Sequence, residues 1–151
     1  MKEVTMDEID RTLLVALSDD GRLSYQQLAA LVHLSANSTA DRVRRLRQSG
    51  VLAGFHAELD LAALGHTLHS LTDINLKESV DRHEFERALN GVPQVLSALH
   101  TTGELDYQLR IVSRNTDELQ SVLDTLQKLG TRDVQSRIVL GETTFEASRL
   151  L

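Results

Sequence analysis

The sequence predicts an α+β protein of two parts, a three-helix domain over residues 1–52 and a ferredoxin-like β-α-β-β-α-β domain over residues 66–151. Two observations support this prediction. In the first part, apolar residues recur at intervals of three and four, the spacing of one helix face. In the second part, such stretches alternate with segments in which every second residue is apolar, the spacing of one strand face. Residues 53–65 are expected to form an extended segment and a hinge linker.

Residues 6–17 predict the first helix. Ile9 and Leu13 begin an apolar stripe with helical spacing. Thr5 and Glu8, three residues apart at the start of this stretch, match the capping-box pattern, in which each side chain bonds the backbone N–H of the other residue. We therefore expect the helix to begin directly after Thr5.

Two further short helices are expected between Ser24 and Gly50, joined by a tight turn. Ser24 and Gln27 form a second capping-box pattern at the start of the first of them. The turn comprises residues 33–35, and Ser35 is a suitable N-cap for the next helix. Gly50 suits the left-handed backbone position that follows a helix end. The spacing therefore predicts two capped helices in close succession.

The third helix has one apolar face and an opposite polar face that is rich in arginine. Thr39, Val43 and Leu46 lie four and three residues apart, so they share the apolar face. Two short helices with such a second helix form a helix-turn-helix, whose second helix enters the major groove of double-stranded DNA. An ordinary solvated helix face is the alternative. We expect DNA contacts from the cap and the polar side chains of this helix, namely Ser35, Asn37, Ser38, Asp41, Arg42, Arg44, Arg45, Arg47 and Gln48.

The charge distribution favours local rather than bulk attraction to DNA. The formal net charge of the chain is −6, yet residues 42–47 contain four arginines and no acidic residue. An acidic body repels the phosphate backbone, so positive potential must be concentrated on the third helix. This pattern is typical of a protein that selects particular DNA sites rather than one that coats DNA.

Composition and missing motifs exclude several other classes. The chain has no cysteine, which excludes disulfides, thiolate zinc sites and cysteine catalysis. It has no apolar run of about 18 residues and no apolar signal core, so we expect a cytoplasmic protein without a membrane partner. The six histidines are scattered, and the HExxH, phosphate-loop and GxSxG patterns do not occur. We therefore expect no catalytic residue, no metal and no cofactor.

The second part is expected to contain four strands and two helices. Tyr107, Leu109 and Ile111 alternate with polar residues, as in a half-buried strand. The expected order is strand 66–76, helix 80–90, strand 95–101, strand 106–112, helix 116–129 and strand 134–140, followed by a tail at 143–150. This order predicts an antiparallel sheet with both helices on one face. A second subunit is expected to cover the other face.

Seven segments, in order along the chain, carry a resemblance to a known family: IDRTLLVAL, DGRLSYQQLA, LVHLS, RVRRLRQSGVLAGF, LAALG, TTGELDYQLRI and VQSRIVL. Together they resemble the leucine-responsive/asparagine-responsive (Lrp/AsnC) family of transcriptional regulators. The resemblance implies an N-terminal helix-turn-helix that binds DNA and a C-terminal domain that binds an effector and forms oligomers. It also implies a homodimer that assembles into tetramers or octamers.

The resemblance further implies that a small effector, often an amino acid, binds between subunits at a turn in the second part. A glycine such as Gly103 lets the backbone approach a ligand, and free N–H groups in such a turn can receive a carboxylate. Asp106 or Glu104 would receive an ammonium group. A simple hairpin turn with Asp106 as a backbone hydrogen-bond acceptor is the alternative. The residues matched to the effector site are Thr102, Gly103, Glu104, Leu105, Asp106, Val134 and Ser136, the last two standing where the family often has threonines.

Two other functions remain as alternatives. Some relatives with the same two-domain plan are enzymes of tetrapyrrole biosynthesis that decarboxylate sirohaem, but such an enzyme would not need the arginines of the third helix. A scaffold that only forms oligomers is the other alternative. Loss of DNA binding when Arg44 and Arg45 are neutralised would exclude the scaffold.

Overall fold

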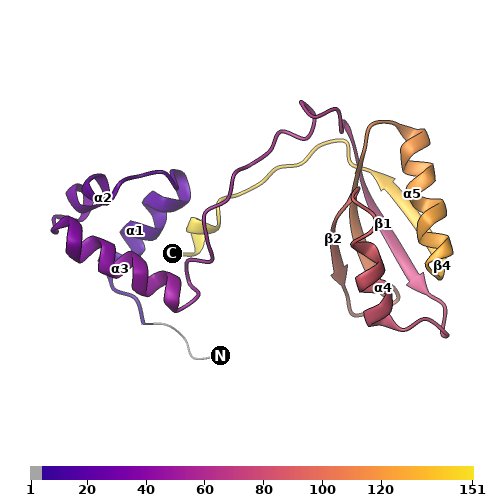
Figure 1. The fold of residues 1–151 in the computed structure, drawn as a ribbon, viewed down its shortest axis with the longest axis horizontal. Coiled ribbons are helices and arrows are strands. Elements are labelled where there is room, and N and C mark those ends of the chain that lie inside the picture. Colours follow the sequence, from indigo (N-terminus) through magenta and orange to yellow (C-terminus); the bar gives the residue numbers. More distant parts are fainter. Residues whose placement is uncertain (1–4) are drawn as a thin grey trace. The chain divides into compact units, whose positions relative to one another are not determined.

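The computed structural model describes residues 5–151 and confirms the predicted α+β class (Figure 1). The chain divides into two compact units, which we describe separately. The helical unit comprises the chain up to Glu58 together with Thr143–Leu151, and the sheet unit comprises Leu59–Glu142. Within the described residues, no helix has the length and apolar character needed to cross a membrane.

The helical unit contains three helices around a small apolar core. Leu13 and Leu17 pack there with Leu28 and Val43, and all four are buried. Because each helix is too short to be stable alone, this shared core is what holds them together. The helices are α1 (Glu8–Asp19), α2 (Tyr25–Val32) and α3 (Ala36–Gln48).

The caps of α2 and α3 are confirmed, whereas the predicted cap of α1 is wrong. Ser24 and Gln27 form the expected capping box, and Ser35 caps α3. At α1 the capping box is formed by Asp7 and Asp10 instead of Thr5 and Glu8, and the Asp7 side chain accepts from Asp10 N–H at 2.8 Å. The same two carboxylates also bind arginines of α3. A capping pattern read from the sequence cannot show this contact, because it considers only residues three positions apart.

The sheet unit has the predicted β-α-β-β-α-β order. Its four strands are all antiparallel and lie in the order β2-β3-β1-β4, so β1 and β3 are central. Both helices lie on one face of the sheet (Figure 1). The elements are β1 (Leu68–Leu76), α4 (Arg82–Leu89), β2 (Val95–His100), β3 (Tyr107–Ser113), α5 (Thr116–Lys128) and β4 (Thr131–Ile138).

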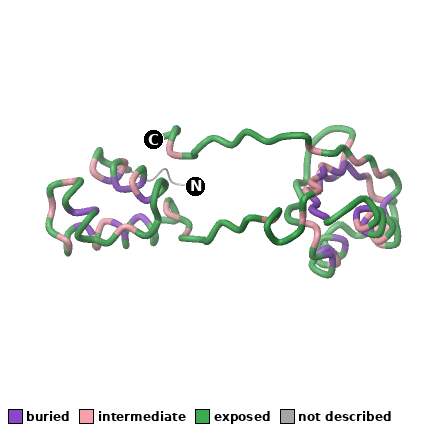
Figure 2. Tube along the Cα trace, turned by 90° about the horizontal axis from the view of Figure 1, so that it is seen from above, coloured by how far each residue is buried: buried purple, intermediate pink, exposed green. Residues whose placement is uncertain are grey.

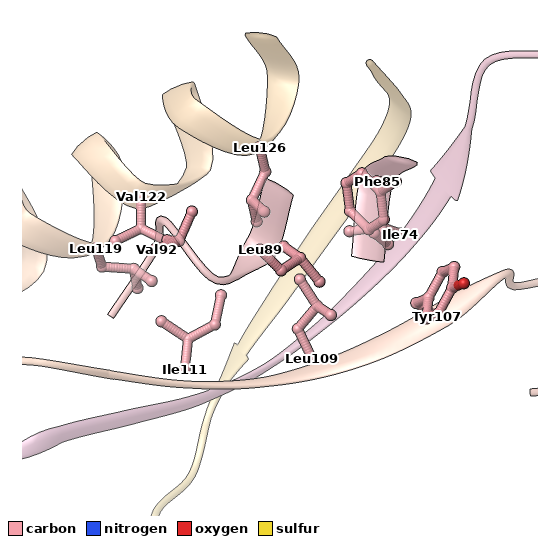
Figure 3. Close-up of a cluster of buried hydrophobic side chains, with 10 residues drawn as sticks. All are labelled: Ile74, Phe85, Leu89, Val92, Tyr107, Leu109, Ile111, Leu119, Val122 and Leu126. Atoms are coloured by element: carbon pink, nitrogen blue, oxygen red, sulfur yellow. The ribbon is translucent and has the colours of Figure 1, made fainter. Parts of the chain in front are cut away.

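The core of the sheet unit lies between the sheet and its two helices (Figure 3). Tyr107, Leu109 and Ile111 of β3 face this core, which confirms the alternation expected for that strand. The opposite face of the sheet is polar around Asp73, which is buried and accepts hydrogen bonds from Gln108 and Arg137. The core shown in Figure 3 comprises Ile74, Phe85, Leu89, Val92, Tyr107, Leu109, Ile111, Leu119, Val122 and Leu126.

The connecting segments are mostly exposed (Figure 2). The C-terminal tail packs with the helical unit and not with the sheet unit. Residues 53–60 have neither helix nor strand, and turns follow at residues 61–65. The tail ends in a 3₁₀-helix, η1 (Ala147–Leu150), which contacts α1. It therefore belongs to the helical unit, whereas the sequence-based boundaries 1–52, 53–65 and 66–151 place it in the second domain. Those boundaries remain a prediction.

Candidate DNA-binding and effector sites

The helix α3 presents its polar side chains away from the core of the helical unit. Thr39, Val43 and Leu46 are buried beneath it, as their spacing predicts. The exposed residues are Ser35, Asn37, Ser38, Asp41, Arg44, Arg45, Arg47 and Gln48, and Arg42 is half-buried. The structure therefore brings the predicted DNA-contacting residues onto one helix surface, with two of the arginines bound at its margin.

Arg42 and Arg45 are bound to carboxylates of the first helix. Arg42 Nη1 lies 2.7 Å from Asp7 Oδ2 and 2.9 Å from Asp10 Oδ1, and Arg45 Nη2 lies 2.7 Å from Asp10 Oδ2. The hydrogen bond from Asp10 N–H, followed by the one from Arg42, lowers the pKa of Asp7, and the same pairing raises the pKa of Arg42. These contacts tie α3 to α1.

Arg44 has a different kind of partner. Its Nη1 lies 2.6 Å from Asp41 Oδ1, one turn earlier on α3, and both side chains are mostly exposed. Exposed ion pairs of this kind are weak, so the pair can open when a base or phosphate competes for the guanidinium. Arg44 is therefore available for contact with DNA at little cost.

Sequence reasoning missed two features of this site. Asp7 and Asp10 were not recognised as arginine partners, although two carboxylates three residues apart before an apolar run are also a capping pattern. His33 has φ 53° and ends α2 in the left-handed conformation that usually belongs to glycine or asparagine. The turn between α2 and α3 is therefore set by a residue that pattern matching does not flag.

The candidate effector turn is anchored to the end of β1. Gly103 has φ 110°, a conformation that other residues rarely adopt, and it is exposed. Asp106 Oδ2 accepts from Leu76 N–H at 2.8 Å, and Asp106 N–H donates to Asn75 Oδ1 at 3.0 Å. Asp106 thus acts as the backbone acceptor of the simple hairpin alternative, whereas Glu104 is exposed at the turn.

Val134 and Ser136 lie on β4, on the face of the sheet that carries the helices. Val134 packs against the core, and Ser136 Oγ lies 2.6 Å from Thr72 Oγ1 of β1. Val134 is paired with Ile74 of β1, which is paired in turn with Tyr107, the residue after Asp106. The register therefore places Val134 in one row with Ile74 and Tyr107, with β1 between β4 and the turn. It also adds the hydroxyl of Thr72 beside Ser136, which sequence reasoning missed.

Two polar pairs, also missed, lie beside the turn that joins β2 to β3. Tyr107 OH donates to Glu86 Oε1 at 2.5 Å, and Arg82 Nη1 lies 2.6 Å from His100 Nε2. Burial, followed by the bond to Glu86, raises the pKa of Tyr107, and the same bond lowers the pKa of Glu86. Because an arginine can only donate, His100 Nε2 is the acceptor in this pair. Among residues 5–151, no group of three or more metal-ligating side chains is assembled.

Comparison with known families and structures decides the identity of the fold. Residues 6–47 match the AsnC-type helix-turn-helix domain, and residues 71–148 match the Lrp/AsnC ligand binding domain. The chain belongs to the Lrp/AsnC family. Within it, the Bkd operon transcriptional regulator of Pseudomonas aeruginosa is 37% identical over 120 residues, which cover 78% of each chain. The leucine-responsive regulatory protein of Rhizobium meliloti is 35% identical over 119 residues, covering 78% of this chain and 76% of that one.

Solved structures agree with this assignment over nearly the whole chain. A transcriptional regulator from Neisseria meningitidis, determined as its complex with L-Met, superimposes with a TM-score of 0.88 at 30% identity, covering 97% of this chain and 100% of that one. AsnC of Escherichia coli superimposes with a TM-score of 0.81 at 26% identity, covering 95% and 98%. This Lrp/AsnC protein is thus a helix-turn-helix transcriptional regulator with a ligand-binding domain. Both curated relatives are named as regulators.

Proposed function

We propose that α3 supplies the sequence-specific contacts of this regulator and that the turn at Thr102–Asp106 receives a small amino acid. The observation that carries the first part is the exposed polar face of α3 above a buried apolar face. Asn37 is suited to adenine and Arg44 to guanine, because their side chains match the major-groove edges of those bases. The regulator acts where the chromosome is, and we place it in the cytoplasm.

A substitution of Arg44 tests the role of α3. The probe is a duplex selected by the full-length wild-type protein from a random pool. Arg44→Ala should cost about 1–3 kcal/mol of binding free energy if Arg44 contacts a base edge through two hydrogen bonds. Arg87→Ala removes an exposed arginine of α4 and serves as the matched control. Equal affinity of the Arg44 variant, the control and the wild type would contradict this role.

DNA binding by a pair of subunits follows from the small size of one helical unit. One α3 with four arginines makes few contacts, and the acidic body of the chain opposes them. Two copies on one face of the duplex, with half-sites about 34 Å apart, restore affinity and require a nearly palindromic site. We propose a homodimer that assembles into tetramers or octamers. Footprints should show protection repeated at one helical turn, and a single protected half-site at all protein concentrations would contradict this proposal.

An amino acid fits the chemistry of the effector turn. The backbone at Gly103 is exposed and can present N–H groups to a carboxylate, and Glu104 can receive the ammonium group. The complex of the Neisseria relative with L-Met supports this class of ligand. The apolar side chain of Val134 favours an apolar amino acid over a polar one.

The effector proposal is tested by a thermal-shift screen of the twenty amino acids. A ligand that binds only the native state stabilises it by RT ln(1 + L/Kd), where L is the free ligand concentration, so the melting temperature rises with ligand concentration. The shift should be lost in Glu104→Gln, which retains the turn. Asp106→Asn is the control, because an amide oxygen can still accept from Leu76 N–H. If no amino acid stabilises the wild type, or if one stabilises the Glu104 variant equally, the site assignment is wrong.

A further inference from the structure

The carboxylate of Asp10 is buried at the contact between α1 and α3. Asp10 as a whole residue is 1% exposed. Within residues 5–151, the only other buried charged residue is Asp73 of the sheet unit. Removing a carboxylate from water is costly, and an apolar side chain of similar volume often gives equal or higher stability. The burial of Asp10 therefore calls for a reason other than stability.

Both carboxylate oxygens of Asp10 are occupied by arginines of α3. Oδ1 accepts from Arg42 at 2.9 Å, and Oδ2 accepts from Arg45 at 2.7 Å. Asp7 adds a second carboxylate to Arg42 at 2.7 Å. These residues are more than thirty positions apart in sequence, so the pairs fix the position of α3 against α1 rather than the shape of either helix.

The two arginines are held in a way that Arg44 is not. The side chain of Asp10 is 2% exposed and that of Arg42 is 24% exposed. The Arg45 side chain is 60% exposed, but its partner is the same buried carboxylate. By contrast, the side chains of Arg44 and Asp41 are 64% and 70% exposed. A buried carboxylate is costly to leave unpaired, so its arginine partners are held in place, whereas an exposed pair on one helix can rearrange. Of these three arginines of α3, Arg42 and Arg45 are therefore bound to α1, whereas Arg44 is free to change partner.

This division has a consequence for DNA recognition. Contacts from arginine to phosphate strengthen binding to every sequence alike, whereas contacts to base edges distinguish sequences. The two positive charges of Arg42 and Arg45 are balanced by the two carboxylates of Asp7 and Asp10, so they add little to the general attraction. At the same time, their fixed geometry holds the base-contacting face of α3 at one angle to the rest of the unit.

We propose that Asp10 is a positioning residue that sets the DNA-sequence selectivity of this regulator through Arg42 and Arg45. It orients α3 and withholds the charge of these two arginines from the phosphates of unselected DNA. The inference rests on the proposed role of α3 in contacting DNA, and it assigns selectivity to a residue of α1 that lies outside the recognition helix.

The main test compares Asp10→Asn with wild type on two duplexes. One is the duplex selected by the full-length wild-type protein, and the other has the same length and composition in scrambled order. Affinity for the selected duplex should fall about tenfold, the effect of losing charge-assisted hydrogen bonds. Affinity for the scrambled duplex should rise, and its dependence on salt should steepen by up to about 0.9 for each arginine that gains a phosphate.

Asp19→Asn is the matched control, because it removes one exposed carboxylate from the same helix. It should leave the ratio of the two affinities unchanged. An unchanged ratio and salt dependence in a folded Asp10→Asn protein would overturn the proposal. By contrast, a wild type that selects no duplex, or an Arg44→Ala variant of normal affinity, would overturn the role of α3 itself.

Arg45→Lys keeps the proposal testable if Asp10→Asn does not fold. Arg45 is 60% exposed, so this change preserves the core and the positive charge. Lysine can still contact a phosphate but lacks the planar geometry of the guanidinium. We expect weaker binding to the selected duplex at unchanged affinity for the scrambled one. Unchanged affinity for both, or a loss confined to one base pair of the selected site, would overturn the proposal.

Discussion

At the scale of single residues, the turn between α2 and α3 depends on His33. Among residues 5–151 it is the only non-glycine residue with positive φ. An L-amino acid in this conformation brings Cβ close to its own backbone, which costs roughly 1–2 kcal/mol. The angle between the two helices of the DNA-binding motif is therefore maintained against a small local strain.

Replacing His33 by glycine should relieve this strain. We expect His33→Gly to raise the free energy of unfolding of the helical unit by about 1 kcal/mol. The matched control is Ala30→Gly, at an exposed position inside α2, which should lower it by about 1 kcal/mol. Urea denaturation of both variants measures the difference, and a loss of stability in both would show that His33 is not strained.

The cap of α1 makes the helical unit sensitive to acid. The pKa of Asp7 is lowered from its ordinary value of 3.8, first by the N–H of Asp10 and then by Arg42. A carboxyl whose pKa is lower in the folded state contributes stability above the unfolded value and loses it as the pH falls through the folded value. The helical unit should therefore lose stability as the pH falls below about 3.8.

Asp7→Asn tests this pH dependence, because the amide oxygen can still cap α1 but cannot ionise. The variant should be less stable than wild type near neutral pH, where it lacks the pair with Arg42. It should also lose less stability on acidification. Unfolding followed by circular dichroism across this pH range provides the comparison, and parallel curves for the two proteins would argue against the linkage.

At the scale of elements, local patterns predicted which segments form helices and strands, while contacts between segments remained hidden. Ser24 and Ser35 begin their helices as predicted, because a cap depends on residues only three positions away. The predicted cap of α1 was wrong because Asp7 and Asp10, which form the cap, also form ion pairs with Arg42 of α3. The same limit applies to the effector site, where the bond from Leu76 N–H to Asp106 joins residues thirty positions apart.

The pairing of β1 with β4 contains a buried hydroxyl contact that can be tested as an element property. Thr72 is fully buried and its hydroxyl lies 2.6 Å from that of Ser136. Thr72→Val should destabilise the sheet unit by about 1 kcal/mol, because it leaves the serine hydroxyl without its partner. Adding Ser136→Ala should restore most of this loss, since removing both polar groups is nearly neutral. If the loss of stability in the double variant equals the sum of the losses in the two single variants, the two hydroxyls are not coupled.

At the scale of the whole molecule, the two compact units do not correspond to the two halves of the sequence. The helical unit contains both the N-terminal helices and the tail Thr143–Leu151. In this unit, η1 contacts α1, and Arg11 Nη1 donates to the carbonyl oxygen of Leu151 at 2.9 Å. Periodicity in the sequence could not predict this, because a short, mostly exposed tail has no face whose partner its pattern could specify.

Ending the chain at Glu142 should therefore weaken the helical unit rather than the sheet unit to which the tail is joined in sequence. The tail lines a groove of about 910 Å³ together with residues that include Leu14 and Leu17, and its loss should expose these two side chains further to water. We expect the free energy of unfolding of the helical unit to fall by about 1–2 kcal/mol. Arg11→Ala removes only the hydrogen bond and should reproduce part of this effect.

Amide hydrogen exchange resolves the two units separately. We expect faster exchange in α1–α3 and unchanged exchange in β1–β4 for the shortened chain. Faster exchange confined to the sheet would instead assign the tail to the second domain, as the sequence-based boundaries do.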